Sequence, residues 1–231
     1  MCGRFVQAQP LDVYASAFGV DIVKTESLKP SYNVAPTDPV YAVAEYHGDR
    51  ILGSFRWGLV PWFSKDRKAA ARHINARVET AAVKPSFRDS FAKRRCLIPA
   101  DGFFEWEPKD KGKLPHYIYP ADHEPMAFAG LWASWKDPES GEKLRTCTIL
   151  TGEPNDLVQP IHDRMPVMLP RDVWSDWLDE DSVDTDQLTV LLATRSAVGL
   201  AEHAVSTLVN KVANNLPENI VPLETGAVDA S

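Results

Sequence analysis

The sequence predicts a mainly antiparallel α+β fold, in which the strands form a barrel-like sheet with short helices at its flanks. Three observations support this class: strand-like segments dominate the middle of the chain, turn signals separate them closely, and no regular helices intervene. Parallel strands need long crossover connections, so the short spacing excludes an alternating strand and helix arrangement. The expected strands are residues 40–46, 51–57, 96–98, 103–106, 116–119, 126–132 and 145–151.

Helical periodicity is confined to five short stretches, at residues 11–18, 86–93, 155–161, 171–178 and 187–193. Turn signals such as His47-Gly48-Asp49 and residues 109–112 separate the strands in between. The short helices are therefore expected to lie at the flanks of the sheet.

Residues 1–231 are expected to form one domain. A chain of 231 residues with 44% apolar residues can bury a substantial core, and its 18 prolines are spread along it. No glycine- or serine-rich linker, internal repeat or low-complexity run divides the chain. The three cysteines are widely separated and odd in number, which is typical of a reducing compartment and offers no metal-binding pair. Cys96 and Cys147 lie in apolar runs and are expected to pack in the core.

The sequence shows neither a signal peptide nor an apolar run of the ~18 residues that a membrane span requires. No spacing of His, Cys and acidic residues is typical of a metal site. We therefore expect a cytosolic protein with no metal, no cofactor and no membrane partner.

The charge is distributed unevenly. Residues 65–95 contain ten basic and three acidic residues, a local charge of +7 in a chain whose net charge is −7, so the remainder carries −14. Seven acidic residues lie between 172 and 186. This asymmetry predicts one anion-binding face on a surface that otherwise repels polyanions, although a run of charges is also typical of a solvated face.

The chain begins Met1-Cys2-Gly3-Arg4-Phe5, so removal of one methionine leaves a cysteine with a free α-amino group. The unperturbed pKa is about 8 for that amine and about 8.5 for the thiol. A 1,2-aminothiol traps aldehydes, because the amine forms an imine and the thiolate then closes a five-membered thiazolidine. The alternative is that Cys2 is an ordinary second residue.

Three polar residues stand out within apolar surroundings. Asn75 can position a substrate hydroxyl or an amine, or it can cap the helix that follows. Glu105 follows Phe103 and Phe104, and burial there would raise its pKa toward the range of a general acid or base. The alternative for Glu105 is a solvent-facing position on a half-buried strand. His162 precedes Asp163 and Arg164, which can tune or orient its ring, although a lone histidine is more often structural.

Read together, these segments resemble the SRAP family, the SOS response-associated peptidases or abasic-site processing proteins. The resemblance runs from residue 1 to about residue 215 and leaves residues 216–231 as a C-terminal tail without recruitment motifs. The matching segments are residues 1–5, 32–37, 56–62, 75–80, 95–106 and 162–166, with Val205-Ser206 and Val209-Asn210 near the end.

The resemblance implies a protein that removes its own Met1 and then uses Cys2 on abasic sites in single-stranded DNA, forming a thiazolidine crosslink that shields the lesion. It also implies a Schiff-base lyase route, whose first step is the same imine. A monomer associated with the nucleoid through DNA is expected.

Catalytic roles implied by the family fall on Cys2 as nucleophile, Asn75 in positioning, Glu105 in methionine removal and proton transfer, and His162 at the sugar oxygen. Phosphate binding and base stacking are expected from the basic segment and nearby aromatic residues, with core packing as the alternative for the aromatic ones. The expected DNA contacts are Arg4, Asn33, Trp57, Trp62, Arg77, Lys84 and Arg88.

Two other functions are compatible with parts of the sequence. An N-terminal-nucleophile hydrolase such as a glutaminase also begins with cysteine, but that function leaves the basic segment and residues 103–106 unexplained. A non-catalytic module that binds single-stranded nucleic acid would account for the basic segment and the aromatic residues.

Overall fold

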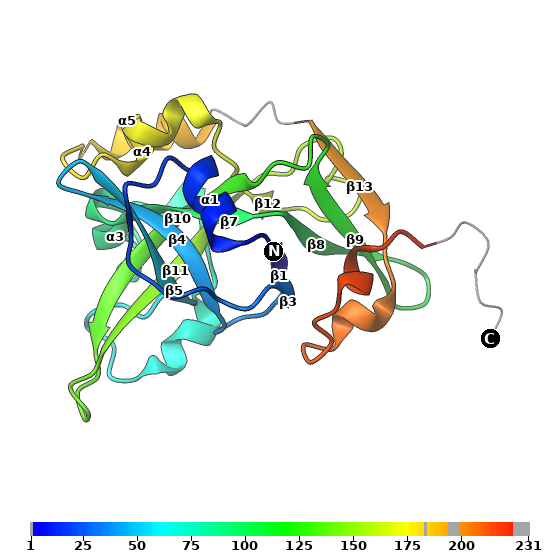
Figure 1. Ribbon diagram of the computed structural model, residues 1–231, viewed down its shortest axis with the longest axis horizontal. Coiled ribbons are helices and arrows are strands. Elements are labelled where there is room, and N and C mark those ends of the chain that lie inside the picture. Colours follow the sequence, from blue (N-terminus) through cyan, green and yellow to red (C-terminus); the bar gives the residue numbers. More distant parts are fainter. Residues whose placement is uncertain (1, 183, 194–198, 224–231) are drawn as a thin grey trace.

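The computed structural model describes residues 2–182, 184–193 and 199–223, and within them the strands form two sheets (Figure 1). The larger sheet has the order β12, β11, β10, β7, β4, β5, β2, and β6 pairs with β11. Its strands are β2 (Ile22–Val23), β4 (Pro39–Tyr46), β5 (Asp49–Trp57), β6 (Asn75–Arg77), β7 (Arg95–Ala100), β10 (Met126–Lys136), β11 (Lys143–Gly152) and β12 (Met165–Pro166).

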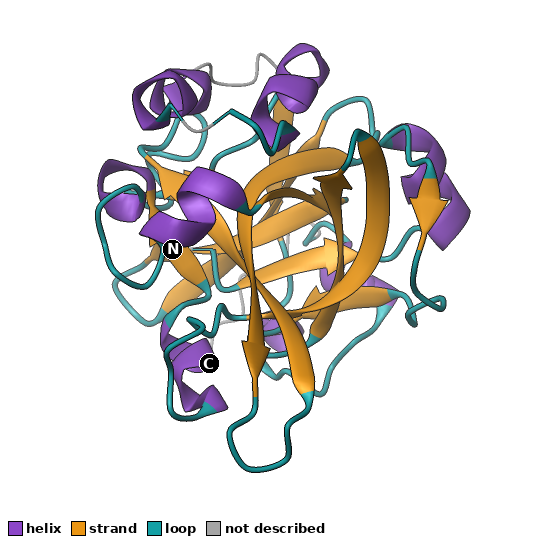
Figure 2. Ribbon diagram, turned by 90° about the vertical axis from the view of Figure 1, so that its left-hand side faces the viewer, coloured by secondary structure: helices purple, strands orange, loops and turns teal. Residues whose placement is uncertain are grey.

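Strand β11 closes the larger sheet into a barrel. It pairs with β10 along one edge and with β5 along the other, where Thr146 lies opposite Arg56 and Cys147 opposite Trp57. The ring of β4, β5, β11, β10 and β7 is thereby complete, and its strands curve around a common interior (Figure 2). The predicted α+β fold with a barrel-like, mainly antiparallel sheet is confirmed, while the parallel pairs of β11 with β5 and β6 were not foreseen.

The second sheet is antiparallel throughout and lies beside the barrel (Figure 1). Its order is β13, β9, β8, β1, β3, with β1 (Arg4–Gln7), β3 (Ser31–Val34), β8 (Gly102–Pro108), β9 (Lys113–Pro120) and β13 (Leu200–Ala204). Arg4 lies opposite Phe104, so β1 brings the start of the chain to the middle of β8. This pairing positions the N-terminal cysteine.

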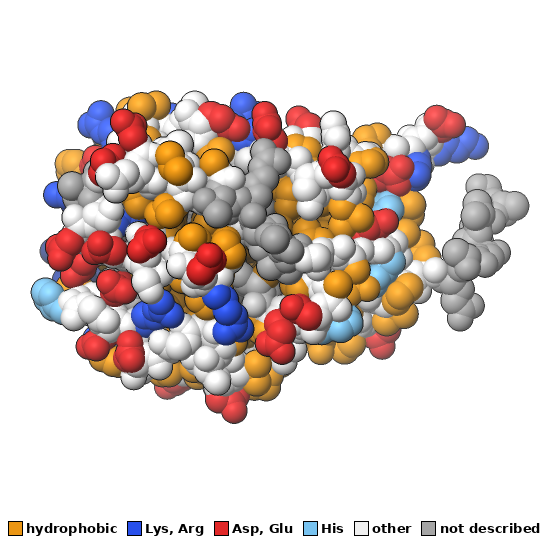
Figure 3. All heavy atoms as spheres, turned by 90° about the horizontal axis from the view of Figure 1, so that it is seen from above, with side chains coloured by type: hydrophobic (Ala, Val, Ile, Leu, Met, Phe, Trp, Pro, Cys, Tyr) orange, Lys and Arg blue, Asp and Glu red, His pale blue; other side chains and the backbone are white. Residues whose placement is uncertain are grey.

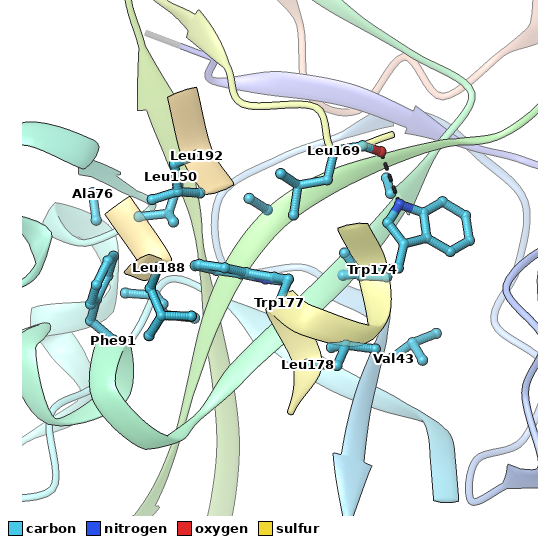
Figure 4. Packing of buried hydrophobic residues seen from close by; sticks show 14 of the residues in the cluster. Val43, Ala76, Phe91, Leu150, Leu169, Trp174, Trp177, Leu178, Leu188 and Leu192 are labelled. Carbon is cyan, nitrogen blue, oxygen red and sulfur yellow. Dashed lines mark hydrogen bonds between the residues drawn. The ribbon is translucent and has the colours of Figure 1, made fainter. Parts of the chain in front are cut away.

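The helices are short and cover the barrel. They are α1 (Leu11–Ala17), α2 (Val78–Ala81), α3 (Arg88–Lys93), α4 (Trp174–Leu178) and α5 (Thr185–Ala193), with 3₁₀ turns η1 (Arg67–Arg72), η2 (Arg171–Val173), η3 (Thr207–Asn210) and η4 (Pro217–Ile220). Trp177 of α4 packs among Phe91, Leu188 and Leu192 (Figure 4). Its indole N–H donates to the carbonyl of Cys96 over 3.1 Å, which ties α4 to β7.

Arg95, the first residue of β7, connects α3 and α4 to the barrel through buried hydrogen bonds. Its side chain is 3% exposed and donates to the carbonyls of Trp177 (2.7 Å), Ala92 (2.6 Å) and Ser182 (3.0 Å), and also to that of Asp179. A buried guanidinium needs all its donors satisfied, so it fixes the ends of α3 and α4 together. Acidic side chains gather on the outer face over α4 and α5 (Figure 3).

All seven expected strands are present, but the prediction of a helix at residues 155–161 is wrong. That segment forms successive turns, with Gln159 N–H bonded to Asn155 O at 2.8 Å and His162 N–H to Val158 O at 2.9 Å. Pro160 has no N–H to continue a helical ladder, so the turns do not merge into a helix. The short strands β1, β3 and β13 were missed, because their pairing depends on partners far away in the sequence.

We expect Gly58→Ala to destabilise the fold strongly. Gly58 has φ of +118°, and a Cβ there would lie 2.5 Å from the carbonyl oxygen of Ala70. The loss should exceed about 3 kcal/mol in chemical denaturation. Gly48→Ala is the control, since Gly48 has φ of +84° with open space around it, and should lose only about 1 kcal/mol. Equal losses would show that the contact with Ala70 is not limiting.

Candidate functional site

Strand β11 supports two sides of the site. On one edge, β6 pairs with it in parallel, so Asn75 lies opposite Ile149 and Arg77 opposite Thr151. On the other edge, β12 pairs with its last residues and anchors the segment that carries His162. The predicted site residues 75 and 162, far apart in the sequence, are therefore positioned by one strand.

Asn75 holds the first residues of the chain in place. Its Nδ2 donates to the backbone carbonyl of Cys2 over 2.7 Å, and its buried Oδ1 has no hydrogen-bond partner among the described residues. Helix α2 begins after Arg77 and has no side-chain cap, so the capping alternative for Asn75 is not supported. An unsatisfied buried acceptor next to the N-terminal cysteine can receive a donor from an amine or a hydroxyl.

Cys2 is completely buried, and its thiol lies 3.5 Å from the carbonyl oxygen of Arg4. Burial raises the pKa of the thiol well above its ordinary value, and the negative charge of Glu105 raises it further. The thiol is therefore protonated at neutral pH in this state of the chain. A nucleophilic thiolate requires a base that removes its proton.

Glu105 lies on β8 and is 2% exposed. Phe103 and Phe104 are also fully buried, so this part of β8 has no solvent face and the solvent-facing alternative is wrong. Burial raises the pKa of Glu105 from its ordinary 4.5 to about 7. The carboxyl group is then divided between its acid and base forms at neutral pH, which is the range that proton transfer requires.

His162 faces Glu105, with 3.9 Å between its Nε2 and Oε2 of the carboxyl group. Its Nδ1 accepts from the backbone N–H of Arg164 over 3.0 Å and lies 2.9 Å from Oδ1 of Asp163. Partial burial lowers the pKa of His162, which favours a neutral ring. Because Nδ1 accepts a hydrogen bond from Arg164, the proton of the neutral ring is assigned to Nε2. The expectation that residues 163 and 164 orient this ring is consistent with these contacts.

Arg164 fixes the segment that carries His162. Its guanidinium forms a bidentate ion pair with Glu79 at 2.7 and 2.8 Å and donates to the carbonyl of Thr151 over 2.7 Å. The ion pair raises the pKa of Arg164 and lowers that of Glu79. Bidentate pairs fix orientation as well as distance. The ion pair therefore fixes the positions of α2, β11 and the segment that carries His162 relative to one another. This positioning role for Glu79 was not predicted from the sequence.

Four of the expected DNA contacts are exposed. Arg77, Lys84 and Arg88 lie at the surface, and Trp62 is 65% exposed with its indole N–H donating to Asp89 over 3.1 Å. Phe63, which the sequence analysis did not single out, is 50% exposed and packs edge-on against Trp62 with ring centres 5.7 Å apart. An exposed aromatic pair that directly precedes a basic segment can stack on unpaired bases.

The other three expected contacts have internal roles. Trp57 is fully buried, packs against Phe5, and donates to the carbonyl of Ile74 over 2.9 Å, so it has no ring face for a base and belongs to the core. Asn33 is 2% exposed, and its amide bonds three backbone carbonyls between residues 209 and 214. Arg4 is half-buried and donates to Asn33 and to the carbonyl of residue 209. In this structure the Asn33 amide thus holds residues 209–214 and is not presented at the surface.

Lys113 influences the site electrostatically. The sequence did not predict this role, because Lys113 lies outside the basic segment of residues 65–95. Its positive charge lowers the pKa values of both Glu105 and His162, although burial has the larger effect on each.

Among the described residues there is no group of three or more His, Cys, Asp or Glu able to hold a metal ion. Over the same part of the chain, no helix is long and apolar enough to cross a membrane.

The fold and the site define a small barrel protein with cysteine, asparagine, glutamate and histidine gathered around the start of its chain. The family model for SRAP, SOS response associated peptidase, matches residues 1–212, and the chain belongs to this family. The chain is 43% identical over 222 residues to the abasic site processing protein YoqW of Bacillus subtilis (strain 168), covering 95% of this chain and 99% of that protein.

Other relatives extend this similarity. The abasic site processing protein HMCES of Gallus gallus is 36% identical, over 86% of this chain and 68% of that protein. A solved structure from Bordetella bronchiseptica is 27% identical with a TM-score of 0.74, over 89% of this chain and all of the other. One from Bacteroides thetaiotaomicron is 24% identical with a TM-score of 0.84 over 96% of this chain, which supports the fold alone.

We expect the buried Glu105 to make stability depend on pH. Its pKa is higher in the folded state, so its contribution is greatest below about 4.5 and is lost as pH rises through about 7. Glu105→Gln should remove this loss, which is at most about 3 kcal/mol, and flatten unfolding free energies between those pH values. Glu124→Gln, at an exposed position, is the control. A profile for Glu105→Gln that matches the wild type would show that Glu105 ionises normally.

Proposed function

We propose that this protein processes abasic sites in single-stranded DNA by forming a thiazolidine crosslink through Cys2, after the chain has removed its own Met1. Relatives over nearly the whole chain are named abasic site processing proteins. The observation that carries the proposal is the hydrogen bond from Asn75 to Cys2 beside a carboxyl group with a pKa of about 7. A buried N-terminal cysteine with an acid–base group is suited to aldehyde capture.

The chemistry needs no external reactant. The open-chain form of an abasic sugar carries an aldehyde, and the α-amine of Cys2 attacks its carbon to form an imine with loss of one water. The Cys2 sulfur then adds to the imine carbon, and the proton of the thiol ends on the ring nitrogen. The product is the DNA plus the protein minus one water.

Glu105 serves both proton transfers. Because its pKa is about 7, the ionised fraction can accept the proton of the Cys2 thiol, whose own pKa is raised by burial. The protonated fraction can supply the proton that lets water leave during imine formation. The same base would assist hydrolysis of the Met1–Cys2 peptide bond, in which one water is consumed, free methionine leaves and the α-amine of Cys2 is formed. Glu105 would thus serve both reactions.

Asn75 and His162 complete the proposed site beside Glu105, Asn75 by holding Cys2 and His162 by donating a proton. The Asn75 amide holds the Cys2 carbonyl, and its free Oδ1 can accept from the α-amine or from a sugar hydroxyl. A neutral His162 with its proton on Nε2 can donate to the ring oxygen of the sugar as the ring opens. The same imine is the first intermediate of a lyase route, so strand cleavage would compete with ring closure.

The basic segment supplies the DNA contacts. Arg77 continues β6 directly from Asn75, and Lys84 and Arg88 follow on the same exposed segment. Their positive charges attract the phosphates of a DNA strand whose abasic site lies at Cys2. The rings of Trp62 and Phe63 can stack on the unpaired bases of that strand. A monomer acting in the cytosol and held at the nucleoid by DNA is part of the proposal.

We expect purified protein to lack Met1 and to gain the mass of an abasic single-stranded oligonucleotide minus one water. Denaturing intact-mass analysis measures both changes. Cys2→Ala should give no adduct, and DNA without the lesion should give none with the wild type. Removal of Met1 without any adduct would instead favour the N-terminal hydrolase, and glutamine hydrolysis would then be assayed.

Charge reversal at Arg77 and Arg88 should weaken binding without touching the chemistry. For single strands the logarithm of affinity falls by about 0.7 per phosphate contact against the logarithm of salt, so losing two contacts should reduce the slope by about 1.4. Fluorescence anisotropy over a salt series measures this. Cys2→Ala should keep the wild-type slope, and an unchanged slope in the reversed variant would place the DNA on another face.

A further inference from the structure

A cleft opens on the barrel where β5 and β11 diverge. The two strands run parallel and pair only where Arg56 and Trp57 meet Thr146 and Cys147. On the N-terminal side of these paired residues, the two strands border a cavity of about 680 Å³, which we name the β5–β11 cleft. Its lining includes Thr37, Phe55, Arg56, Trp132, Lys143 and Arg145.

Three cations line this cleft without acidic partners. Among the described residues, Arg56, Lys143 and Arg145 take part in no ion pair and no side-chain hydrogen bond. The Nε of Arg56 is buried and has no acceptor. Three unpaired cations in a chain of net charge −7 have an electrostatic preference for an anion.

The floor of the cleft is aromatic. Trp132 is partly exposed, and Phe55 is buried against it with ring centres 6.0 Å apart in an edge-on arrangement. An adjoining hollow of about 230 Å³ shares Phe55, Trp132 and Arg145 and adds Lys24 and one acid, Glu45. A ligand with both a flat apolar ring and a negative group satisfies the tryptophan and the cations together.

The cleft adjoins the Cys2 site through Trp57. Thr37, at the edge of the cleft, donates its N–H to the carbonyl of Trp57 over 2.8 Å. The indole of Trp57 donates in turn to the carbonyl of Ile74, next to Asn75. The buried Trp57 is therefore hydrogen-bonded both to the edge of the cleft and to the residue that precedes Asn75.

We infer that the β5–β11 cleft binds a nucleotide of the single strand that flanks the lesion, with its base on Trp132 and its phosphates on Arg56, Lys143 and Arg145. The inference rests on the proposed function, because it names a second contact region for the same DNA. It accounts for cations that neither the core nor the Cys2 site uses. Contact at two places on one strand strengthens binding of long strands over short ones.

The test compares Arg145→Glu with Lys111→Glu. Both side chains are exposed, and Lys111 lies in the β8–β9 turn, away from the β10–β11 hairpin (Figure 1). Lesion-free single strands of about 4 and about 16 nucleotides are titrated by anisotropy over a salt series. Crosslinking of a short abasic oligonucleotide is measured in parallel by intact mass. Trp132→Leu is a second variant, checked for folding by circular dichroism.

Arg145→Glu should weaken binding of the long strand and lower its salt slope by about 0.7, with no change for the short strand or its crosslinking. Trp132→Leu should weaken the long single strand but not duplex DNA. An effect of Lys111→Glu equal to that of Arg145→Glu, or equal losses for single strand and duplex, would overturn the inference. Failure of the wild type to crosslink any abasic strand would contradict the proposed function, while loss of long-strand binding in Arg145→Glu would still support the cleft.

Discussion

The edge of β11 that faces away from β10 is the constraint on which the site depends. That edge first pairs with β5 at Thr146 and Cys147, and then with β6 from Ile149 to Thr151. The chain between β5 and β6 must leave the barrel after the pairing with Cys147 and return to the same edge two residues further along, at Ile149. Gly58 makes the exit, with its N–H bonded to Cys147 O at 2.8 Å. Barrel closure and the placement of Asn75 thus depend on neighbouring backbone pairings along one edge of β11.

Burial of polar groups is the energetic cost of this arrangement. Glu105 and Cys2 are both removed from water, which raises both pKa values and opposes ionisation of either group. An apolar residue at position 105 would pack more favourably in such surroundings. The shift of the Glu105 pKa to about 7 makes its proton exchangeable at neutral pH, which is consistent with the proton transfer proposed for this residue.

Electrostatics separates the molecule into faces with different partners. The outer face over α4 and α5 carries the acidic stretch of residues 172–186, whereas residues 65–95 carry a charge of +7 beside β6. A polyanion is repelled from the first and attracted to the second. The cations of the β5–β11 cleft, Arg56, Lys143 and Arg145, belong to neither of these two segments.

Local sequence patterns predicted the seven longest strands, four of the five expected helices and the candidate site residues Cys2, Glu105 and His162, because alternation and residue type are properties of neighbours. Only the tertiary structure decided which residues meet. Asn33 was expected at a DNA-binding surface, and Trp57 either there or in the core. Both are buried, since their partners Ile74 and residues 209–214 come from other elements. The parallel pairs of β11 were likewise invisible, because a hydrogen bond between distant strands leaves no periodic mark in either one.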